Sequence, residues 1–168
     1  MTIQFNADNK SKQCFPDVPE YSVKGVKSFM GQEGLGYECT LYKDGKRIGT
    51  VTDTCDGGEM LQMYLKGDGE KALEAYCLTL PKNTFTSDGK EHSYHIDPCI
   101  FVGRLVDKFE TDKRNKKNCK TKTLVEVEEN GEKVVYAYKC KFSQEIKQKI
   151  KDRDYPDTDV VFVNERYL

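Results

Sequence analysis

The stretch YECTLYKDGKRIGTVTD, residues 37–53, decides the fold class. In residues 37–43, apolar and polar side chains alternate, which places the apolar ones on one face of a β-strand because successive side chains point to opposite faces. Asp44-Gly45 follows, and both residue types tolerate the positive φ angles of a two-residue hairpin turn. Residues 47–53 are rich in β-branched side chains, so they predict the antiparallel return strand.

Similar patterns on both sides extend this hairpin into a sheet. Residues 21–29 form a strand candidate in which Gly25 marks the position of a bulge, and residues 60–65 form another. Short turns connect antiparallel neighbours, so we expect these four strands in meander order. A second hairpin is predicted over residues 121–140, around Asn130-Gly131.

Helical periodicity replaces strand alternation in three segments. One covers residues 68–80, another begins at Asp97-Pro98, and a short third begins at Ser143, all with residues typical of helix N-termini. Residues 81–96 are predicted to be a long polar loop, and residues 160–163 a buried final strand. The apolar faces of the first two helices comprise Leu73, Tyr76, Cys77 and Leu80, and then Phe101, Val102, Leu105, Val106 and Phe109.

These elements predict an α+β protein: an antiparallel β-sheet meander with two or three helices packed on one face. Residues 1–20 lack periodicity and contain two prolines, which indicates an irregular N-terminal arm. Residues 21–168 are expected to form a single α+β domain. A linker over residues 112–121 is the one place where that domain could be subdivided.

Composition narrows the class of protein. With 168 residues, 37% of them hydrophobic, the chain can bury enough surface to fold without a metal or a disulfide. It contains no apolar run of the ~18 residues that a membrane span requires, and its first residues do not resemble an export signal. We therefore expect a cytoplasmic protein without a membrane partner. Its seven cysteines include no C-x-x-C pair, so neither a disulfide framework nor a cysteine zinc knuckle is indicated.

His92 and His95 are the only histidines, and Cys99 follows four residues later. These three residues are the candidate metal ligands of the chain. A structural zinc site needs four ligands, however, and the H-x-x-H spacing lacks a C-x-x-C partner. Two exposed loop histidines are therefore the simpler interpretation, and no metal or other cofactor is expected.

Catalytic motifs are not evident. The cluster GQEGLG, residues 31–36, reverses the glycine spacing of a dinucleotide-binding loop and leads into a strand, so it predicts a β-turn. The chain has no G-x-S-x-G nucleophile elbow, and its paired carboxylates have polar neighbours that would not raise a pKa for acid catalysis. An enzyme is therefore less favoured than a binding protein.

A basic stretch over residues 108–122 stands out against a net charge of −1, since seven basic residues oppose two acidic ones there. Part of this charge complements the C-terminus of the preceding helix. Such clusters also neutralise nucleic-acid phosphates or contact acidic proteins. A solvated loop is the alternative. The predicted contact residues are Lys113, Arg114, Lys116, Lys117 and Lys120.

One part of the chain resembles a known group of proteins. The matching residues are Val26-Lys27-Ser28-Phe29, Gly31, Glu33-Gly34-Leu35-Gly36-Tyr37, Thr40-Leu41-Tyr42-Lys43-Asp44-Gly45-Lys46 and Asp56-Gly57-Gly58. They resemble small uncharacterised proteins encoded by bacteriophages and prophages, mainly over residues 23–80. The resemblance implies a phage origin but carries no activity or catalytic residue.

Small phage proteins of this kind often bind and block a host machine, including CRISPR and other defence systems. The resemblance therefore implies a non-enzymatic binding protein that engages a host protein or ribonucleoprotein in the host cytoplasm. A nucleic-acid-binding accessory protein that uses the basic stretch is the second hypothesis. A small metal-dependent or thiol enzyme is the third.

The cysteine pattern gives a first testable prediction. All seven thiols should be reduced in the native protein, because the spacing shows no disulfide framework. Denatured but unreduced protein treated with iodoacetamide should therefore carry seven adducts when its intact mass is measured. Two missing adducts that return after reduction would contradict the prediction.

Overall fold

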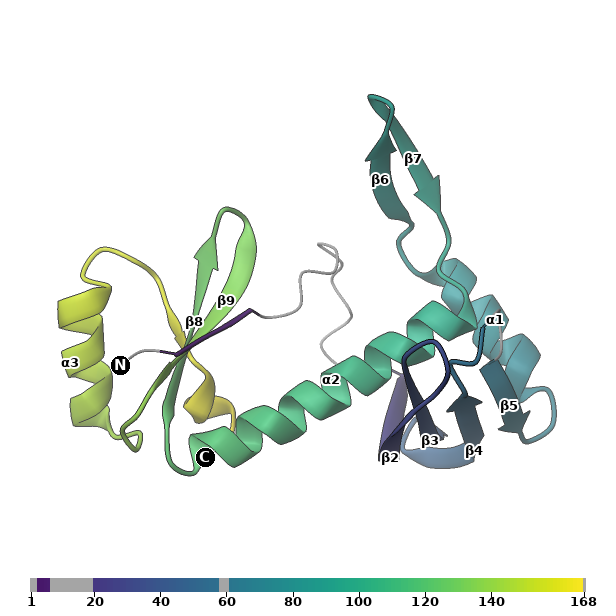
Figure 1. Ribbon diagram of the computed structural model, residues 1–168, viewed down its shortest axis with the longest axis horizontal. Coiled ribbons are helices and arrows are strands. Elements are labelled where there is room, and N and C mark those ends of the chain that lie inside the picture. Colours follow the sequence, from purple (N-terminus) through teal and green to yellow (C-terminus); the bar gives the residue numbers. More distant parts are fainter. Residues whose placement is uncertain (1–2, 7–19, 58–60, 168) are drawn as a thin grey trace. The chain divides into compact units, whose positions relative to one another are not determined.

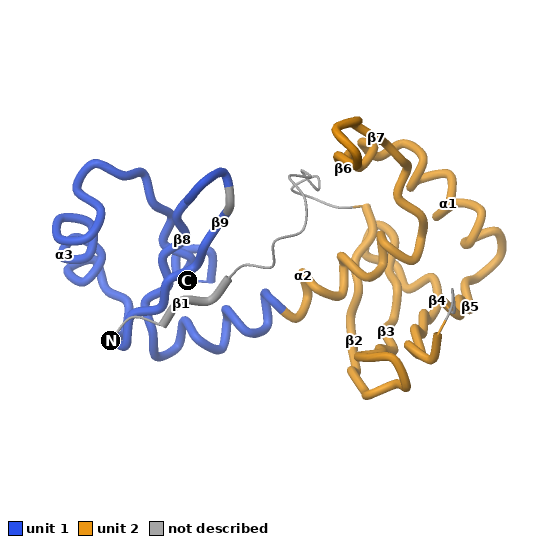
Figure 2. Tube along the Cα trace, turned by 45° about the horizontal axis from the view of Figure 1, so that its top comes forward, with its two compact units in different colours: residues 1–10, 111–168 blue, residues 11–110 orange. Residues whose placement is uncertain are grey.

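The computed structural model describes residues 3–6, 20–57 and 61–167, and it has the α+β fold that the sequence predicts (Figure 1). Two compact units divide the chain (Figure 2). Unit 1 combines residues 1–10 with residues 111–168, and unit 2 comprises residues 11–110. The division falls within a helix and lies next to residues 112–121. Among the described residues, no helix is both long and apolar enough to cross a membrane.

Unit 2 contains the predicted four-stranded antiparallel meander. Its strands, in spatial and chain order, are β2 (Tyr21–Met30), β3 (Leu35–Lys43), β4 (Lys46–Asp53) and β5 (Leu61–Leu65). Asp44 and Gly45 have φ angles of 48° and 75°, which confirms the predicted hairpin turn. The register between β2 and β3 shifts between Lys24 and Lys27, and Gly25 in this interval has φ of 63°, so the predicted bulge is confirmed.

Two helices, α1 (Gly69–Thr79) and α2 (Pro98–Cys119), share one hydrophobic core with this sheet. The rings of Tyr21, Tyr76 and Phe101 pack against one another with centroids 4.9–5.9 Å apart, within the range of favourable aromatic contacts. The predicted apolar helix faces are therefore confirmed. Fully buried members of the core include Tyr21, Leu41, Val51, Leu73 and Val102.

The two helix starts differ in their capping. The Asp97 carboxylate accepts a hydrogen bond from the Ile100 backbone N–H at 2.8 Å, so Asp97 is an N-cap as predicted. Asp68 occupies the equivalent position before α1, but its side chain makes no capping hydrogen bond. The start of α1 thus depends on burial of Leu73 and Cys77 rather than on a cap.

The polar loop predicted for residues 81–96 is wrong. This segment forms a hairpin of β6 (Asn83–Ser87) and β7 (Lys90–Tyr94). Asp88 and Gly89 make the turn with φ angles of 52° and 71°, so it carries the same Asp-Gly signal as the first hairpin. The strands escaped prediction because nearly all of their residues are exposed, which leaves no alternation of apolar and polar side chains.

Residues 112–121, the predicted place of a linker, are helical over most of their length because α2 continues to Cys119, and the boundary between the two units falls just before them. The polar composition of residues 110–118 hides the helix from a search for apolar periodicity. Its end is nevertheless fixed within unit 1, where Cys119 packs against a small core of Leu124, Ala137 and Val163.

Unit 1 contains a second antiparallel sheet in the order β1-β9-β8-β10. Asn130 and Gly131 have φ angles of 54° and 78°, which confirms the second predicted hairpin turn. The strands are β1 (Ile3–Asn6), β8 (Thr123–Glu129), β9 (Glu132–Tyr138) and β10 (Val161–Phe162).

Two predictions about the chain ends need correction. Residues 3–6 are not part of an irregular arm, because they form the edge strand β1 beside β9; residues 7–19 lie outside the described part of the chain. The final strand is shorter than predicted, since β10 gives way to a 3₁₀ helix, η1 (Val163–Arg166). Both differences reflect pairing with distant β-strands, which local patterns do not encode.

The two faces of this sheet are covered differently. Helix α3 (Gln144–Asp154) packs over Val125, Val127 and Val134 through Ile150. The opposite face carries Leu124 and Ala137 beneath η1. Ser143 caps α3 as predicted, since its Oγ accepts a hydrogen bond from the Ile146 N–H at 3.2 Å.

The glycine cluster at residues 31–36 lies where two loops meet. The Glu33 N–H donates to the Cys55 carbonyl at 2.9 Å, and the Gln32 N–H donates to the Asp56 carboxylate at 3.0 Å. A Cβ on Gly31 would lie 2.2 Å from the Thr54 carbonyl oxygen, so a larger residue cannot fit there. The cluster is therefore a tight turn, as predicted, and close backbone approach explains this glycine.

Burial in α1 gives a prediction with an internal control. Leu73 is fully buried, whereas Leu78 on the same helix is 61% exposed. Leu73→Ala should lower the free energy of unfolding by about 2–5 kcal/mol, the range for core truncations, and Leu78→Ala by less than about 0.5 kcal/mol. Urea denaturation followed by circular dichroism measures both values. Equal losses in the two variants would contradict the observed packing of α1.

Candidate functional site

The predicted contact residues lie on a helix and not in a loop. Lys113, Arg114, Lys116 and Lys117 occupy the last two turns of α2, and Lys120 lies in the turn that follows. All five are exposed. The prediction of a solvated loop is therefore wrong in its geometry, and the helix gives the charges defined relative directions.

Helical geometry brings three of these lysines onto one face. At about 100° per residue, Lys113, Lys116 and Lys117 project within an arc of about 100°. Arg114 lies about 60° beyond Lys117 at the edge of this arc, and its Nη2 donates a hydrogen bond to the Thr111 hydroxyl at 3.4 Å. The helix end therefore presents a row of ammonium groups beside a separate guanidinium group.

The helix dipole explains part of this charge. Cations in the last turn gain about 0.3–1 kcal/mol from the carbonyl groups at a helix C-terminus, which accounts for Lys116 and Lys117. The effect fades beyond that turn, so it does not account for Lys113 or Arg114. Like charges three and four residues apart, such as Lys113 and Lys117, instead cost about 0.2–0.5 kcal/mol per pair. The helix dipole and these like-charge pairs thus act in opposite directions at the end of α2.

The buried side chain of Asn164 fixes the end of α2. Its amide oxygen accepts a hydrogen bond from the Leu124 N–H at 2.8 Å, and its amide nitrogen donates to the carbonyls of Lys122 at 2.8 Å and Cys119 at 3.4 Å. Asn164 is 2% exposed. One side chain thus connects η1, the end of α2 and the start of β8, and it orients the turn that carries Lys120.

An acidic residue of the helix end is held by a neighbour. The Tyr167 hydroxyl donates a hydrogen bond to the Asp112 carboxylate at 2.9 Å. Burial, followed by this hydrogen bond, raises the pKa of Tyr167 to about 12, so the phenol keeps its proton at neutral pH. Asp112 is therefore committed to a partner within unit 1.

Two further lysines, Lys139 and Lys141, lie beside the basic stretch. The β8–β9 register pairs Thr123 with Tyr138, and the Thr123 hydroxyl donates to the Cys140 carbonyl at 3.0 Å. This bond places the exposed residues Lys139 and Lys141 next to the start of β8. Counting residue pairs outward from the Asn130-Gly131 turn would have revealed this proximity from the sequence.

We call this set of cations the basic end of unit 1. It comprises Lys113, Arg114, Lys116, Lys117, Lys120, Lys122, Lys139 and Lys141. Charge is also divided between the units: unit 1 has 15 basic and 12 acidic residues, and unit 2 has 12 and 16, which gives net charges of +3 and −4. The basic end therefore belongs to the unit with positive net charge.

Two other cations of unit 1, Lys133 and Arg166, pair with a carboxylate. Glu126 accepts from both Nη atoms of Arg166 at 3.2 Å and lies 3.3 Å from Lys133 Nζ. Burial works to raise the pKa of Glu126, but the two cations outweigh it and hold that pKa below its usual range. Arg166 and Lys133 therefore satisfy a half-buried carboxylate and are not part of the basic end.

The candidate metal ligands do not form a site. His92 lies on β7 with its ring stacked on Phe85, His95 follows that strand, and Cys99 lies in the first turn of α2. Within residues 3–6, 20–57 and 61–167, no three His, Cys, Asp or Glu side chains come together in a way that could hold a metal ion. The described residues therefore do not bring His92, His95 and Cys99 together as a set of metal ligands.

The buried thiols have raised pKa values. Burial raises the pKa of both Cys39 and Cys77 to about 11, so these two thiols stay protonated at neutral pH and are poor nucleophiles. The six cysteines in the described part of the chain form no disulfide with one another.

Comparisons with known proteins add no assignment to this geometry. No protein-family model, no curated protein and no solved structure matches the chain. The resemblance to phage proteins therefore remains a prediction from the sequence.

The Asn164 contacts give a prediction for unit 1. Asn164→Ala removes the partner of the buried Leu124 N–H, which should cost about 1–3 kcal/mol in the free energy of unfolding. Amide hydrogen exchange should show lost protection at Leu124. Asn164→Asp retains the acceptor but not the donor, so Leu124 should stay better protected than in the alanine variant. Unchanged exchange at Leu124 in Asn164→Ala would refute the role given to this side chain.

Proposed function

We propose that this protein is a non-enzymatic binding protein that engages the phosphate backbone of a nucleic acid through the basic end of unit 1. The nucleic acid would be free or part of a ribonucleoprotein. The observation that carries the proposal is the row formed by Lys113, Lys116 and Lys117 on the final turns of α2, with Lys139 and Lys141 near the start of β8. Phosphates release counterions when such cations approach, which supplies most non-specific affinity.

The structure of unit 1 supports this proposal in two ways. Lys113, Arg114, Lys116 and Lys117 lie on a helix, and the other members of the basic end lie in the short segments that directly follow α2 and β9, so binding costs little ordering of the backbone. The nearby acid Asp112 is hydrogen-bonded to Tyr167, and Lys133 and Arg166 pair with Glu126. The exposed cations of the basic end, including Lys116, Lys117 and Lys120, are therefore available to an anionic partner.

The biological setting that we propose is a bacteriophage or prophage protein. Its target would then be a ribonucleoprotein of the host, including a defence complex, and the effect would be inhibition. The support for this setting is the resemblance of residues 23–80 to phage-encoded proteins. An acidic surface on a host protein is the competing partner, and the experiment below separates the two.

Binding is tested with fluorescein-labelled oligo(dT), a labelled RNA strand and a labelled DNA duplex, by fluorescence anisotropy at several salt concentrations. Five phosphate contacts alone predict a slope of log K against log salt of about −3.5 for single strands and about −4.5 for the duplex. Replacing the five predicted contact residues by alanine should remove most of that slope and of the affinity. The melting temperature should change little, since exposed charges contribute little to stability.

A matched control changes the same number and type of residues in unit 2. This variant replaces four lysines and one arginine by alanine, at Lys27, Lys46, Arg47, Lys66 and Lys71. It should keep the wild-type slope. A variant with arginine at the four lysine positions of the predicted contact set should also retain binding, because phosphate contact requires charge and not a particular side chain. Equal losses in the contact and control variants, or no binding by the wild-type protein, would refute the proposal and favour a protein partner.

A further inference from the structure

The β6–β7 hairpin extends away from the core of unit 2 (Figure 1). All residues of β6 and β7 are exposed except Asn83. The side-chain Oδ1 of the buried Asn83 accepts a hydrogen bond from Arg104 Nη2 of α2 at 3.1 Å, and Ile96 is buried just beyond β7. The base of the hairpin is therefore anchored while its two strands stand in solvent.

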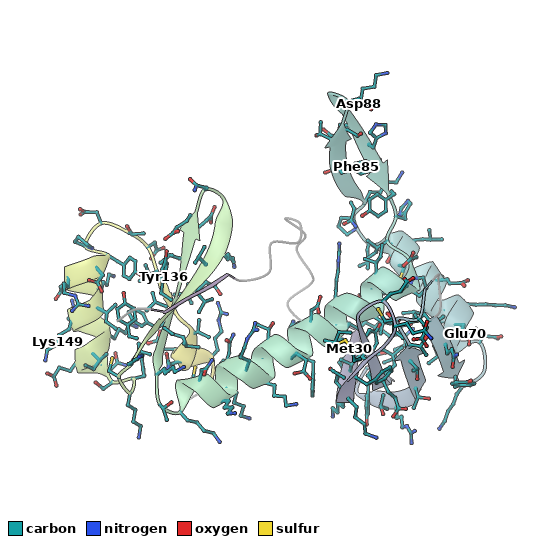
Figure 3. The ribbon with its side chains drawn as sticks, viewed as in Figure 1. Met30, Glu70, Phe85, Asp88, Tyr136 and Lys149 are labelled. Atoms are coloured by element: carbon teal, nitrogen blue, oxygen red, sulfur yellow. The ribbon has the colours of Figure 1, made fainter. Side chains whose placement is uncertain are left out.

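One face of this hairpin carries three aromatic rings. The register places His92 directly opposite Phe85, and Tyr94 lies on the same face two residue pairs closer to the base. The Phe85 and His92 rings stack with centroids 5.2 Å apart and planes 22° from parallel, and Phe85 meets Tyr94 edge-on at 6.0 Å. Phe85 is nevertheless 51% exposed and Tyr94 42% exposed. Figure 3 shows the Phe85 side chain on this extended hairpin.

The two faces of the hairpin differ in charge. The aromatic face also carries Ser87 and Lys90, which are paired across the strands, and it has no acidic residue. Glu91 lies on the opposite face with Thr84, Thr86 and Ser93, and Asp88 lies in the turn. The aromatic face is thus apolar at its centre and positively charged at the end nearest the turn.

Hairpin stability explains the rings only in part. A cross-strand aromatic pair contributes about 0.2–1 kcal/mol, which helps a two-stranded hairpin that is marginal alone. That contribution comes from the ring surfaces in contact with each other. About half of Phe85 still faces water, where it gains nothing for the fold.

We propose that the face formed by Phe85, His92 and Tyr94 is a stacking platform for unpaired bases of single-stranded nucleic acid, with Lys90 beside it for a phosphate. Every base has an aromatic face, so stacking binds strands with little sequence preference, and a basic neighbour holds the backbone. This face carries no acidic residue, which suits an anionic partner. This inference rests on the nucleic-acid function proposed above.

Two substitutions of Phe85 separate stacking from hairpin stability. Phe85→Leu retains apolar cross-strand packing but removes the aromatic face, so affinity for oligo(dT) should fall about 5- to 150-fold, the range for loss of one stacked base. The slope of log K against log salt should not change, since no charge is removed. Thr86→Ala, on the opposite face, is the control and should bind like the wild-type protein.

Phe85→Trp supplies a direct optical readout. The chain contains no tryptophan, so this variant has a single indole, whose fluorescence should be quenched when oligo(dT) stacks on it. Thr84→Trp places the indole on the opposite face and should show little quenching. Together the two variants report which face of the hairpin meets the bases.

The outcomes distinguish this inference from the proposed function. Unquenched Phe85→Trp together with wild-type affinity in Phe85→Leu would overturn the platform. If the five-alanine variant of the basic end still lost affinity in that case, the proposed function would stand. Absence of oligo(dT) and RNA binding by the wild-type protein would overturn both. Loss of affinity in Phe85→Leu for the duplex as much as for oligo(dT) would also overturn base stacking, because paired bases cannot reach the rings.

Discussion

The side chain of Asn164 is the interaction on which the described architecture of unit 1 depends. A helix end, a strand start and a 3₁₀ helix meet there, and each leaves backbone groups that its own hydrogen bonds do not satisfy. One carboxamide supplies an acceptor to Leu124 and donors to Lys122 and Cys119 within a site that excludes water. Neither a charged nor an apolar side chain could do both. The positions of the basic residues around this junction follow from it.

Both proposed binding surfaces place costly features in the solvent. The basic end concentrates like charges on one helix, and the β6–β7 hairpin leaves aromatic rings half in water. Each feature has a partial explanation in local stability, through the helix dipole or through cross-strand pairing. Cross-strand pairing leaves the outer face of Phe85 unexplained. The proposals account for the exposed charge and for this ring face with a ligand that is both anionic and aromatic.

Elements that depend on the preferences of neighbouring residues were predictable from the sequence, whereas elements that depend on pairing between distant residues were not. The turns at Asp44-Gly45 and Asn130-Gly131 were predictable because the preference for positive φ belongs to the residues themselves. The β6–β7 hairpin has the same Asp-Gly turn signal. Its strands have no buried face, so their sequence lacks the alternation of apolar and polar side chains that would have predicted them. Strand β1 was not predictable, because its order comes from pairing with β9, more than a hundred residues away. For the site, the five cations were visible in the sequence, whereas their helical arrangement and the neighbouring Lys139 and Lys141 required the structure.

Strand β1 has a consequence for how the protein is made. Ile3 pairs with Ala137, so unit 2 is inserted between two parts of unit 1. At a synthesis rate of about 5–20 residues per second, roughly 7–27 seconds separate the emergence of β1 from that of its partner strand. Unit 2 ends at Glu110, so its synthesis is finished roughly 1–5 seconds before residue 137 is made. The first strand of the chain is therefore among the last to find its place, and an unpaired strand that waits in this way is open to capture by chaperones.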